Sequence, residues 1–344
     1  MRKIPLLDEV IESAYVRKLV VGTVGILALL AVAGAIFPDT IVGDLANIVF
    51  AGGTLTSTAR TAAPIVLAAL GGIFAEKSGV INIGLEGLLI ISAFVSVHTA
   101  TVVGAGNAIL GIPALWVGFL VGVAASTALA GVFGIVCIEF KADQIIAGLA
   151  VWLIALGLAP FLSTVFYGGV NTPALSTNLG WQFSALLIAV GTVTSWWTLN
   201  HTSFGKHLQA AGENPKALDT VGVSVSRVRH AGVLLSGFLS GIGGSTLALT
   251  VGQFVGSGQT MVQGKGFIAI VAYLFGNYNP IGALGAGILF AGLEAVQLRL
   301  QQLGYAVPDT LVQTIPYVVV IVVLALVGRT QLPEAAGEHY ETEE

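Results

Sequence analysis

Charged residues are unevenly spaced along the chain, and the long intervals between them are apolar. Glu86 and Glu139 enclose 52 uncharged residues, and Asp143 and Lys206 enclose 62. A helix needs about 20 apolar residues to cross the roughly 30 Å hydrocarbon core of a membrane. Each interval therefore has room for two membrane-spanning helices, separated by turns rich in Gly, Pro, Asn and Ser.

The apolar segments are expected to be helices. In lipid the backbone must satisfy its own hydrogen bonds, and the segments lack the alternation of a membrane β-barrel. We predict an all-α integral membrane protein with about ten transmembrane helices, of which the second and the eighth are short, as in broken helices beside a transport path. Residues 42–57 are semi-polar and fit a re-entrant or interfacial piece. The predicted spans are 19–37, 58–75, 83–103, 110–137, 143–166, 181–199, 230–251, 263–276, 281–300 and 310–328.

Lysine and arginine set the expected orientation. With the N-terminus in the cytoplasm, 11 of the 14 basic residues fall in inside segments, which fits the positive-inside rule. Both termini are then cytoplasmic. The expected organisation is a cytoplasmic segment over 1–18, a transmembrane domain over 19–328 with one sizeable cytoplasmic loop at 200–229, and an acidic cytoplasmic tail over 329–344, which we expect to be solvated.

Composition narrows the function classes. Charged residues make up 9% of the chain, against roughly 25% in soluble domains, which excludes an ordinary soluble enzyme and a nucleic-acid binder. The stretch Gly258–Gly266 comes nearest to a phosphate-binding loop, but it has one residue too many and a glycine where the hydroxyl belongs. No metal motif or nucleophile elbow occurs in the sequence. Any energy for transport must therefore come from an ion gradient or from a separate protein.

Three acidic residues lie in or at the ends of apolar spans, where charge is costly. Glu86 either pairs with a nearby amide or Lys77 and fixes its loop, or it serves directly in solute binding or gating. Asp143 stands at the start of a span, where an acid complements a helix N-terminus. Glu294 shares a polar strip with Gln297 and Gln301 that lines an aqueous face or a partner.

The loop over 200–229 contains a helix signal. Asn214 is a good N-cap and Pro215 is tolerated at the first helical position, while Gly222 suits a helix end. We therefore predict a short helix over Asn214–Val221 that lies parallel to the membrane. It is either a connector or a compact knob that another protein grips.

This loop also carries a resemblance. Ala211–Gly222 resembles the coupling segment of ATP-binding-cassette importer permeases for ribose-type sugars and nucleosides, and Ala75–Gly87 resembles the signature of the nucleoside branch. The resemblance covers roughly 45–328, and its pieces occur in order on the expected spans. Further matching stretches are Ala142–Ile146, Ser236–Gly244, Gly266–Ala272 and Asn279–Pro280.

The resemblance implies a multi-pass permease of a prokaryotic plasma membrane, without cofactors of its own. Its partners would be a second related permease, a cytoplasmic ATPase that holds ATP and Mg²⁺, and an extracellular substrate-binding lipoprotein. Candidate pathway residues are Asn82, Glu86 and Gln144. The residues expected to couple to the ATPase are Gly212, Glu213, Asn214, Pro215, Ala217, Leu218 and Gly222.

Other functions stay open at this point. The permease could import ribose or another simple sugar, although the stretch Gly84–Glu86 favours nucleosides within the resemblance. A gradient-driven secondary transporter or a channel would share the composition and need no ATPase. An intramembrane enzyme has no supporting nucleophile–base or metal spacing.

Overall fold

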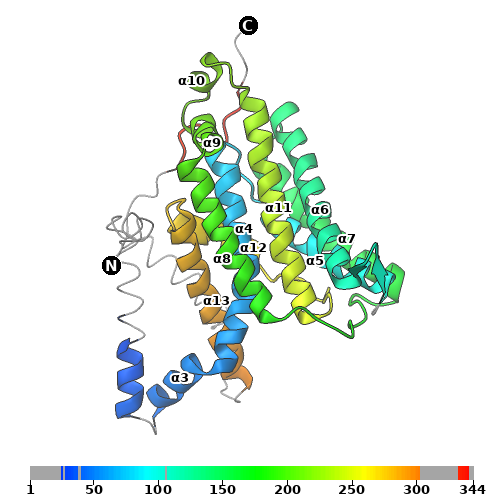
Figure 1. Ribbon diagram of the computed structural model, residues 1–344, viewed down its shortest axis with the longest axis vertical. Helices are drawn as coiled ribbons and strands as arrows, with labels where there is room; N and C mark the ends of the chain where they lie inside the picture. The colour runs from blue at the N-terminus through cyan, green and yellow to red at the C-terminus, as the bar shows by residue number, and fades with distance from the viewer. Residues whose placement is uncertain (1–24, 26–27, 38–39, 105–106, 303–331, 341–344) are drawn as a thin grey trace.

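The computed structural model describes residues 25, 28–37, 40–104, 107–302 and 332–340. Long helices run along the long axis of the molecule, with α9 and α10 at one end and α3 at the other (Figure 1). The predicted span 310–328 lies outside the described residues, and the span 19–37 lies partly outside them. The helices are α3 (Ile41–Phe50), α4 (Gly52–Lys77), α5 (Leu85–Val103), α6 (Ala114–Gly134), the π-helix η1 (Ile135–Glu139), α7 (Gln144–Tyr167), α8 (Trp181–His201), α9 (Ser203–Glu213), α10 (Pro215–Thr220), α11 (Val225–Val251), α12 (Lys265–Phe275) and α13 (Pro280–Gln302).

Within the described residues, six helical segments are long and apolar enough to cross a membrane: α4, α5, α6 with η1, α7, α11 and α13. The all-α membrane character of the chain is thus confirmed. The eighth predicted span is short as expected, because α12 has 11 residues. Helix α8 has 21 residues but is not one of the six.

Two span predictions were wrong in detail. Helix α4 is not short but has 26 residues, and it begins at Gly52, inside the segment taken as semi-polar. The fourth span starts at Ala114 rather than at 110, because a small antiparallel hairpin precedes it. This hairpin pairs β1 (Ala108–Ile109) with β2 (Ile112–Pro113), and Gly111 turns it with a φ of +79°.

The core lies between α4, α5 and α11. Within an apolar stretch of 18 residues in α4 and in α11, 78% of the residues are buried. In the corresponding stretch of α7, 17% are buried. Helix α7 therefore presents most of its apolar surface outward, as a lipid-facing helix does. Glycines allow the helices to approach closely: a Cβ on Gly237 would collide with Ala130 of α6, and one on Gly244 would collide with α5. Small residues let helices approach closely where lipid supplies no hydrophobic drive.

Candidate functional site

The N-terminus of α12 lies in the interior and is bound by Glu86 of α5. The Glu86 carboxylate accepts hydrogen bonds from the backbone nitrogens of Gly264 at 2.8 Å and Gly266 at 2.6 Å, and its side chain is 2% exposed. A carboxylate is favourable at the positive end of a helix, whose first N–H groups have no partner within the helix. Glu86 therefore pairs with amides, but they belong to a distant segment rather than to a neighbouring loop. Its direct role in solute binding or gating stays a prediction.

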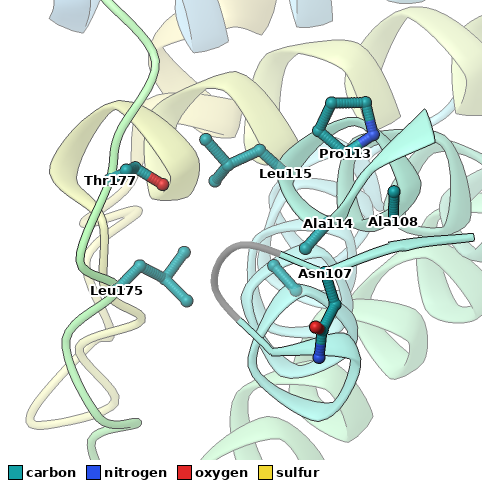
Figure 2. A pocket seen from close by; sticks show the side chains of 8 residues that line it. Asn107, Ala108, Pro113, Ala114, Leu115, Leu175 and Thr177 are labelled. Carbon is teal, nitrogen blue, oxygen red and sulfur yellow. The ribbon is translucent and has the colours of Figure 1, made fainter. Parts of the chain in front are cut away.

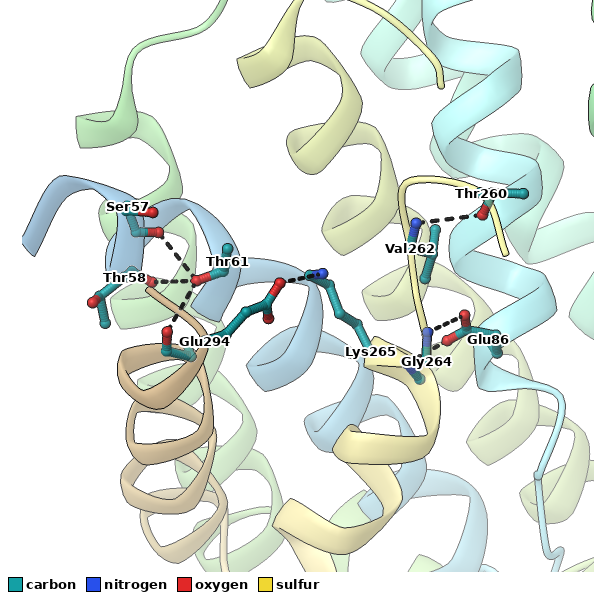
Figure 3. Close-up of polar contacts among 11 residues, drawn as sticks. Ser57, Thr58, Thr61, Glu86, Thr260, Val262, Gly264, Lys265 and Glu294 are labelled. Carbon is teal, nitrogen blue, oxygen red and sulfur yellow. Dashed lines mark hydrogen bonds and ion pairs between the residues drawn. The ribbon is translucent and has the colours of Figure 1, made fainter. Parts of the chain in front are cut away.

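Lys265, the first residue of α12, forms an ion pair with α13. Its ammonium nitrogen lies 2.8 Å from the Oε1 atom of Glu294, and the side chains are 3% and 20% exposed respectively. Beside this pair, the Thr61 hydroxyl of α4 lies 3.4 Å from the Ala291 carbonyl of α13 (Figure 3). The sequence marked Glu294 as an acid in an apolar span but did not indicate its pairing with Lys265. Their shared position at the ends of apolar stretches was the available signal.

The other end of α12 is bound to α4. The Glu76 carboxylate accepts hydrogen bonds from the hydroxyls of Tyr273, which is in α12, and Tyr278, which follows it. All three side chains are buried. Burial and the neighbouring carboxylate raise the pKa of Tyr278 above its ordinary value, so its hydroxyl remains a donor at physiological pH. Sequence reasoning missed this cluster, because nothing near Glu76 indicates a partner some 200 residues later.

Asn82 and Gln144 meet at the loop between α4 and α5. Asn82 donates to the Ser236 hydroxyl of α11 at 3.0 Å and accepts from the Gly84 backbone nitrogen. Gln144 accepts from the Ile81 backbone nitrogen at 2.7 Å. Both side chains are buried. The predicted trio is therefore divided: Asn82 and Gln144 shape this loop, while Glu86 binds α12. Asp143 caps α7 as predicted, through the nitrogen of Ile146.

The segment over 200–229 contains the predicted short helix, observed as α10. Asn214 caps it by accepting from the Ala217 nitrogen at 3.1 Å, and Pro215 begins it. Leu218 is buried beneath the helix, and Gly222 follows it with a φ of +79°. Glu213, Asn214 and Ala217 are exposed. The helix thus rests on one apolar residue and presents polar positions outward.

The rest of that segment is more ordered than a polar insert. Helix α8 continues to His201, and α9 fills most of the space before α10. Gly212, near the end of α9, lies against the backbone of Lys77, where a Cβ would collide with the Lys77 carbonyl. Of the predicted coupling residues, Gly212 is therefore packed directly onto the end of α4.

The C-terminal tail corrects another expectation. Residues 332–340 are not a solvated end, because Pro333 and Ala335 are buried and the backbone is bonded to the rest of the protein. The Ala335 nitrogen donates to the Gly212 carbonyl at 2.8 Å, and the Gly337 nitrogen donates to the Gly79 carbonyl at 3.0 Å. The missed signal was the apolar Pro333 and Ala335, which flank Glu334 on either side.

Two cavities lie at opposite ends of the bundle. A cavity of about 180 Å³ beside the tail is lined by polar and charged side chains, among them Lys141, Gln144 and Arg229. A cavity of about 160 Å³ near the hairpin is mainly apolar, and Leu175, Thr177 and Leu115 face one another across it (Figure 2). Among the described residues, no cluster of three His, Cys, Asp or Glu side chains could hold a metal ion.

Comparisons with known proteins identify the family. The family described as "Branched-chain amino acid transport system / permease component" matches residues 54–328. The guanosine ABC transporter permease protein NupQ of Bacillus subtilis is 37% identical over 304 residues, covering 81% of this chain and 93% of the relative. The nucleoside ABC transporter permease protein NupC of Lactococcus lactis is 35% identical over 301 residues, covering 80% and 93%.

One sugar-named relative is also similar. TsgC13 of Haloferax volcanii, provisionally named as a glucose ABC transporter permease, is 31% identical over 275 residues, covering 75% of this chain and 80% of the relative. No solved structure matches the chain. The family covers the core helices together with α9 and α10, so this chain belongs to the permease components of ABC transporters, as a multi-pass protein of the plasma membrane.

Proposed function

We propose that this permease imports nucleosides, in a transporter driven by ATP hydrolysis on a separate subunit. The observation that carries the substrate class is the similarity to permeases named for guanosine and for nucleosides over about four fifths of the chain. The alternative is a simple sugar, which the relative named for glucose supports at lower identity and coverage.

The proposed complex pairs this chain with a second related permease, an ATPase that holds ATP and Mg²⁺, and an extracellular substrate-binding lipoprotein. This chain itself would carry no cofactor. In the proposed topology both termini are cytoplasmic and ten helices span the membrane, so that residues 1–18, the loop 200–229 and the tail 329–344 share the cytoplasmic side. In this proposal the second to the ninth of the ten spans correspond to described helices, and α8 and α12 are counted among them.

In the proposed mechanism, α10 is the coupling helix, with Gly212 to Gly222 as the coupling segment. ATP-driven closure of the ATPase moves α10, and the bundle switches a central pathway from outward-open to inward-open. The exposed polar positions of α10 and its single buried anchor, Leu218, suit a small helix that a second protein grips from outside.

In our proposal three buried residues hold the moving parts in place rather than contacting the solute: Asn82, Glu86 and Gln144. Each is hydrogen-bonded to the backbone or to Ser236. A group of partly exposed polar side chains on α4 and α13 is the better candidate for the pathway wall. It includes Ser57, Thr58 and Glu294, which retain partial exposure in an apolar protein, as intramembrane polar groups on a pathway do.

Uptake of labelled purine and pyrimidine nucleosides tests the substrate class. Cells that carry the gene are compared with cells that lack it, in a host without another nucleoside carrier, with free ribose as competitor. We expect uptake that depends on the gene and resists excess ribose. Gene-dependent uptake of sugar without nucleoside uptake would replace the proposed substrate with the alternative one.

Purification in mild detergent tests the energy source. Recovery of an ATPase with this chain supports coupling to ATP, while reproducible purification without one would favour a gradient-driven transporter. A Leu218→Asp variant provides the matched comparison: we expect it to lose the ATPase, because it would place a charge under α10.

A further inference from the structure

The described C-terminal segment, Leu332–Tyr340, touches four parts of the bundle end that carries α9 and α10. Its backbone bonds to Gly212 in α9 and to Gly79 between α4 and α5. Its Glu338 carbonyl accepts from Arg229 of α11, and its Tyr340 side chain reaches α10. In Figure 1 the red segment lies beside α9, between the green and blue parts of the chain. This segment therefore adds hydrogen bonds between elements of the bundle end that are far apart in the sequence.

Tyr340 makes the contact with α10. Its hydroxyl donates to the Oδ2 atom of Asp219 at 2.9 Å, and its partly buried ring packs against the apolar core. Asp219 is the fifth of the six residues of α10. A hydrogen bond to a carboxylate is stronger than one between neutral groups, so this bond gives α10 a second attachment besides Leu218.

Arg229 of α11 makes the contact with the middle of the segment. Its guanidinium donates from Nη1 to the Glu338 carbonyl at 2.7 Å, and the residue is only 4% exposed. Its Nε and Nη2 atoms have no hydrogen-bond partner among the described residues. A buried guanidinium is costly when it lacks acceptors, so the tail supplies a contact that the bundle itself does not.

Two glycines fix how the segment lies on the loop. Gly337 and Gly79 have φ values of +83° and +94°, and a Cβ on Gly79 would approach Arg229 Nη2 within 2.9 Å. Residues other than glycine rarely adopt this backbone conformation, because their Cβ atom is crowded at positive φ. The bond between the Gly337 nitrogen and the Gly79 carbonyl therefore fits one register of the tail.

The loop that the tail holds leads directly to α12. Gly79 follows Glu76 by three residues, and Glu76 is the carboxylate that binds Tyr273 and Tyr278 at the end of α12. A continuous series of contacts therefore runs from Asp219 in α10 through the tail to the α4 end and on to α12. Each step is a hydrogen bond or a few residues of backbone.

We infer that Leu332–Tyr340 is a strap that makes α10 and the α4–α5 loop move as one unit, with Tyr340 as the positioning residue of the coupling helix. This inference rests on the proposed function, because it assigns α10 the task of receiving motion from the ATPase. The strap gives that motion a route to α12 that bypasses the α10–α11 connection.

The test uses the complete importer in lipid vesicles, with ATP hydrolysis and solute transport measured on the same sample. In Tyr340→Phe, which removes only the hydroxyl, we expect hydrolysis to continue while transport per ATP falls about three- to tenfold, the range expected from one hydrogen bond of ordinary net strength at a partly exposed site. Glu334→Gln is the matched control, since Glu334 is an exposed tail residue, and we expect it to behave as wild type.

Asp219 variants separate positioning from a direct contact with the ATPase. Asp219→Asn keeps an acceptor oxygen and should retain most of the coupling, whereas Asp219→Ala should lose it. Adding Tyr340→Phe to Asp219→Ala should cause no further loss, because both variants remove the same bond. An additive double variant, or Tyr340→Phe with wild-type transport per ATP, would overturn the strap.

A distance measurement keeps the inference independent of the substrate. Spin labels on Glu334→Cys and Thr220→Cys, in a Cys137→Ser background, should keep one separation with and without ATP, and Tyr340→Phe should broaden it. A wild-type separation that changes with ATP refutes the strap even where nucleosides are transported. Absent nucleoside uptake with an unchanged separation refutes the proposed substrate alone.

Discussion

Helices α12 and α10 are both short, with 11 and 6 residues, yet they are held in opposite ways. Three carboxylates from three other helices hold α12, and nearly all of the groups involved are buried. Helix α10 is held by its own cap, one buried leucine and the tail, and its other side is exposed. Polar bonds in an apolar interior are costly to leave unmade, so α12 is held firmly to its neighbouring helices, whereas α10 has few attachments to the bundle.

Breaking the ion pair of α12 should have the largest effect on stability. Lys265→Met leaves the Glu294 carboxylate without its ammonium partner, 2.8 Å away in the wild type. Loss of one partner of a buried pair costs about 3 kcal/mol or more. We expect a marked fall in the thermal stability of the detergent-solubilised protein.

The double variant Lys265→Met with Glu294→Gln is the control, because it removes both charges. It should recover much of the lost stability. Equal stabilities of Lys265→Met and the wild type would show that the pair does not hold α12, and the contrast between the two helices would weaken.

Neutralising the cap of α12 should have an intermediate effect. Glu86→Gln retains one acceptor oxygen but loses the charge that two backbone nitrogens share, at a cost of about 1–2 kcal/mol. Amide hydrogen exchange should rise at the start of α12, while solute affinity stays normal. Lost affinity with unchanged exchange would instead place Glu86 in contact with the solute.

Removing the cap of α10 should have the smallest effect on overall stability. Asn214→Ala leaves the Ala217 nitrogen without its side-chain acceptor, which costs about 1 kcal/mol in the helix itself. We expect normal yield and melting temperature but a lower rate of transport per ATP hydrolysed. Asn214→Asp, which can still cap, should behave as wild type, and an equal defect in both would point to a contact of Asn214 itself.

The sequence was sufficient where structure is local. Asn214, Pro215 and Gly222 define α10 through the chemistry of a helix start and end, and Asp143 caps α7 for the same reason. The long apolar intervals likewise predicted α5, α7 and α11. The caps depend on residues within one turn of one another, and each span depends on one continuous stretch of sequence.

Long-range contacts were not predictable from the same patterns. Glu86 and Gly266 are 180 residues apart, and no local signal pairs them. The start of α4 was missed for a different reason: its hydroxyl residues look polar in sequence, yet Thr58 and Thr61 donate to the carbonyls of Thr54 and Ser57 one turn earlier. Such back-bonding satisfies the hydroxyl inside a helix.

The position of Glu86 has a consequence for charge selection along the pathway. The positive end of an interrupted helix attracts anionic groups, and some transporters use it to bind a substrate carboxylate. In this permease the corresponding end of α12 is already neutralised by a carboxylate of the protein itself. A phosphorylated solute would therefore gain no attraction from that helix end, while an uncharged solute would lose nothing by passing it.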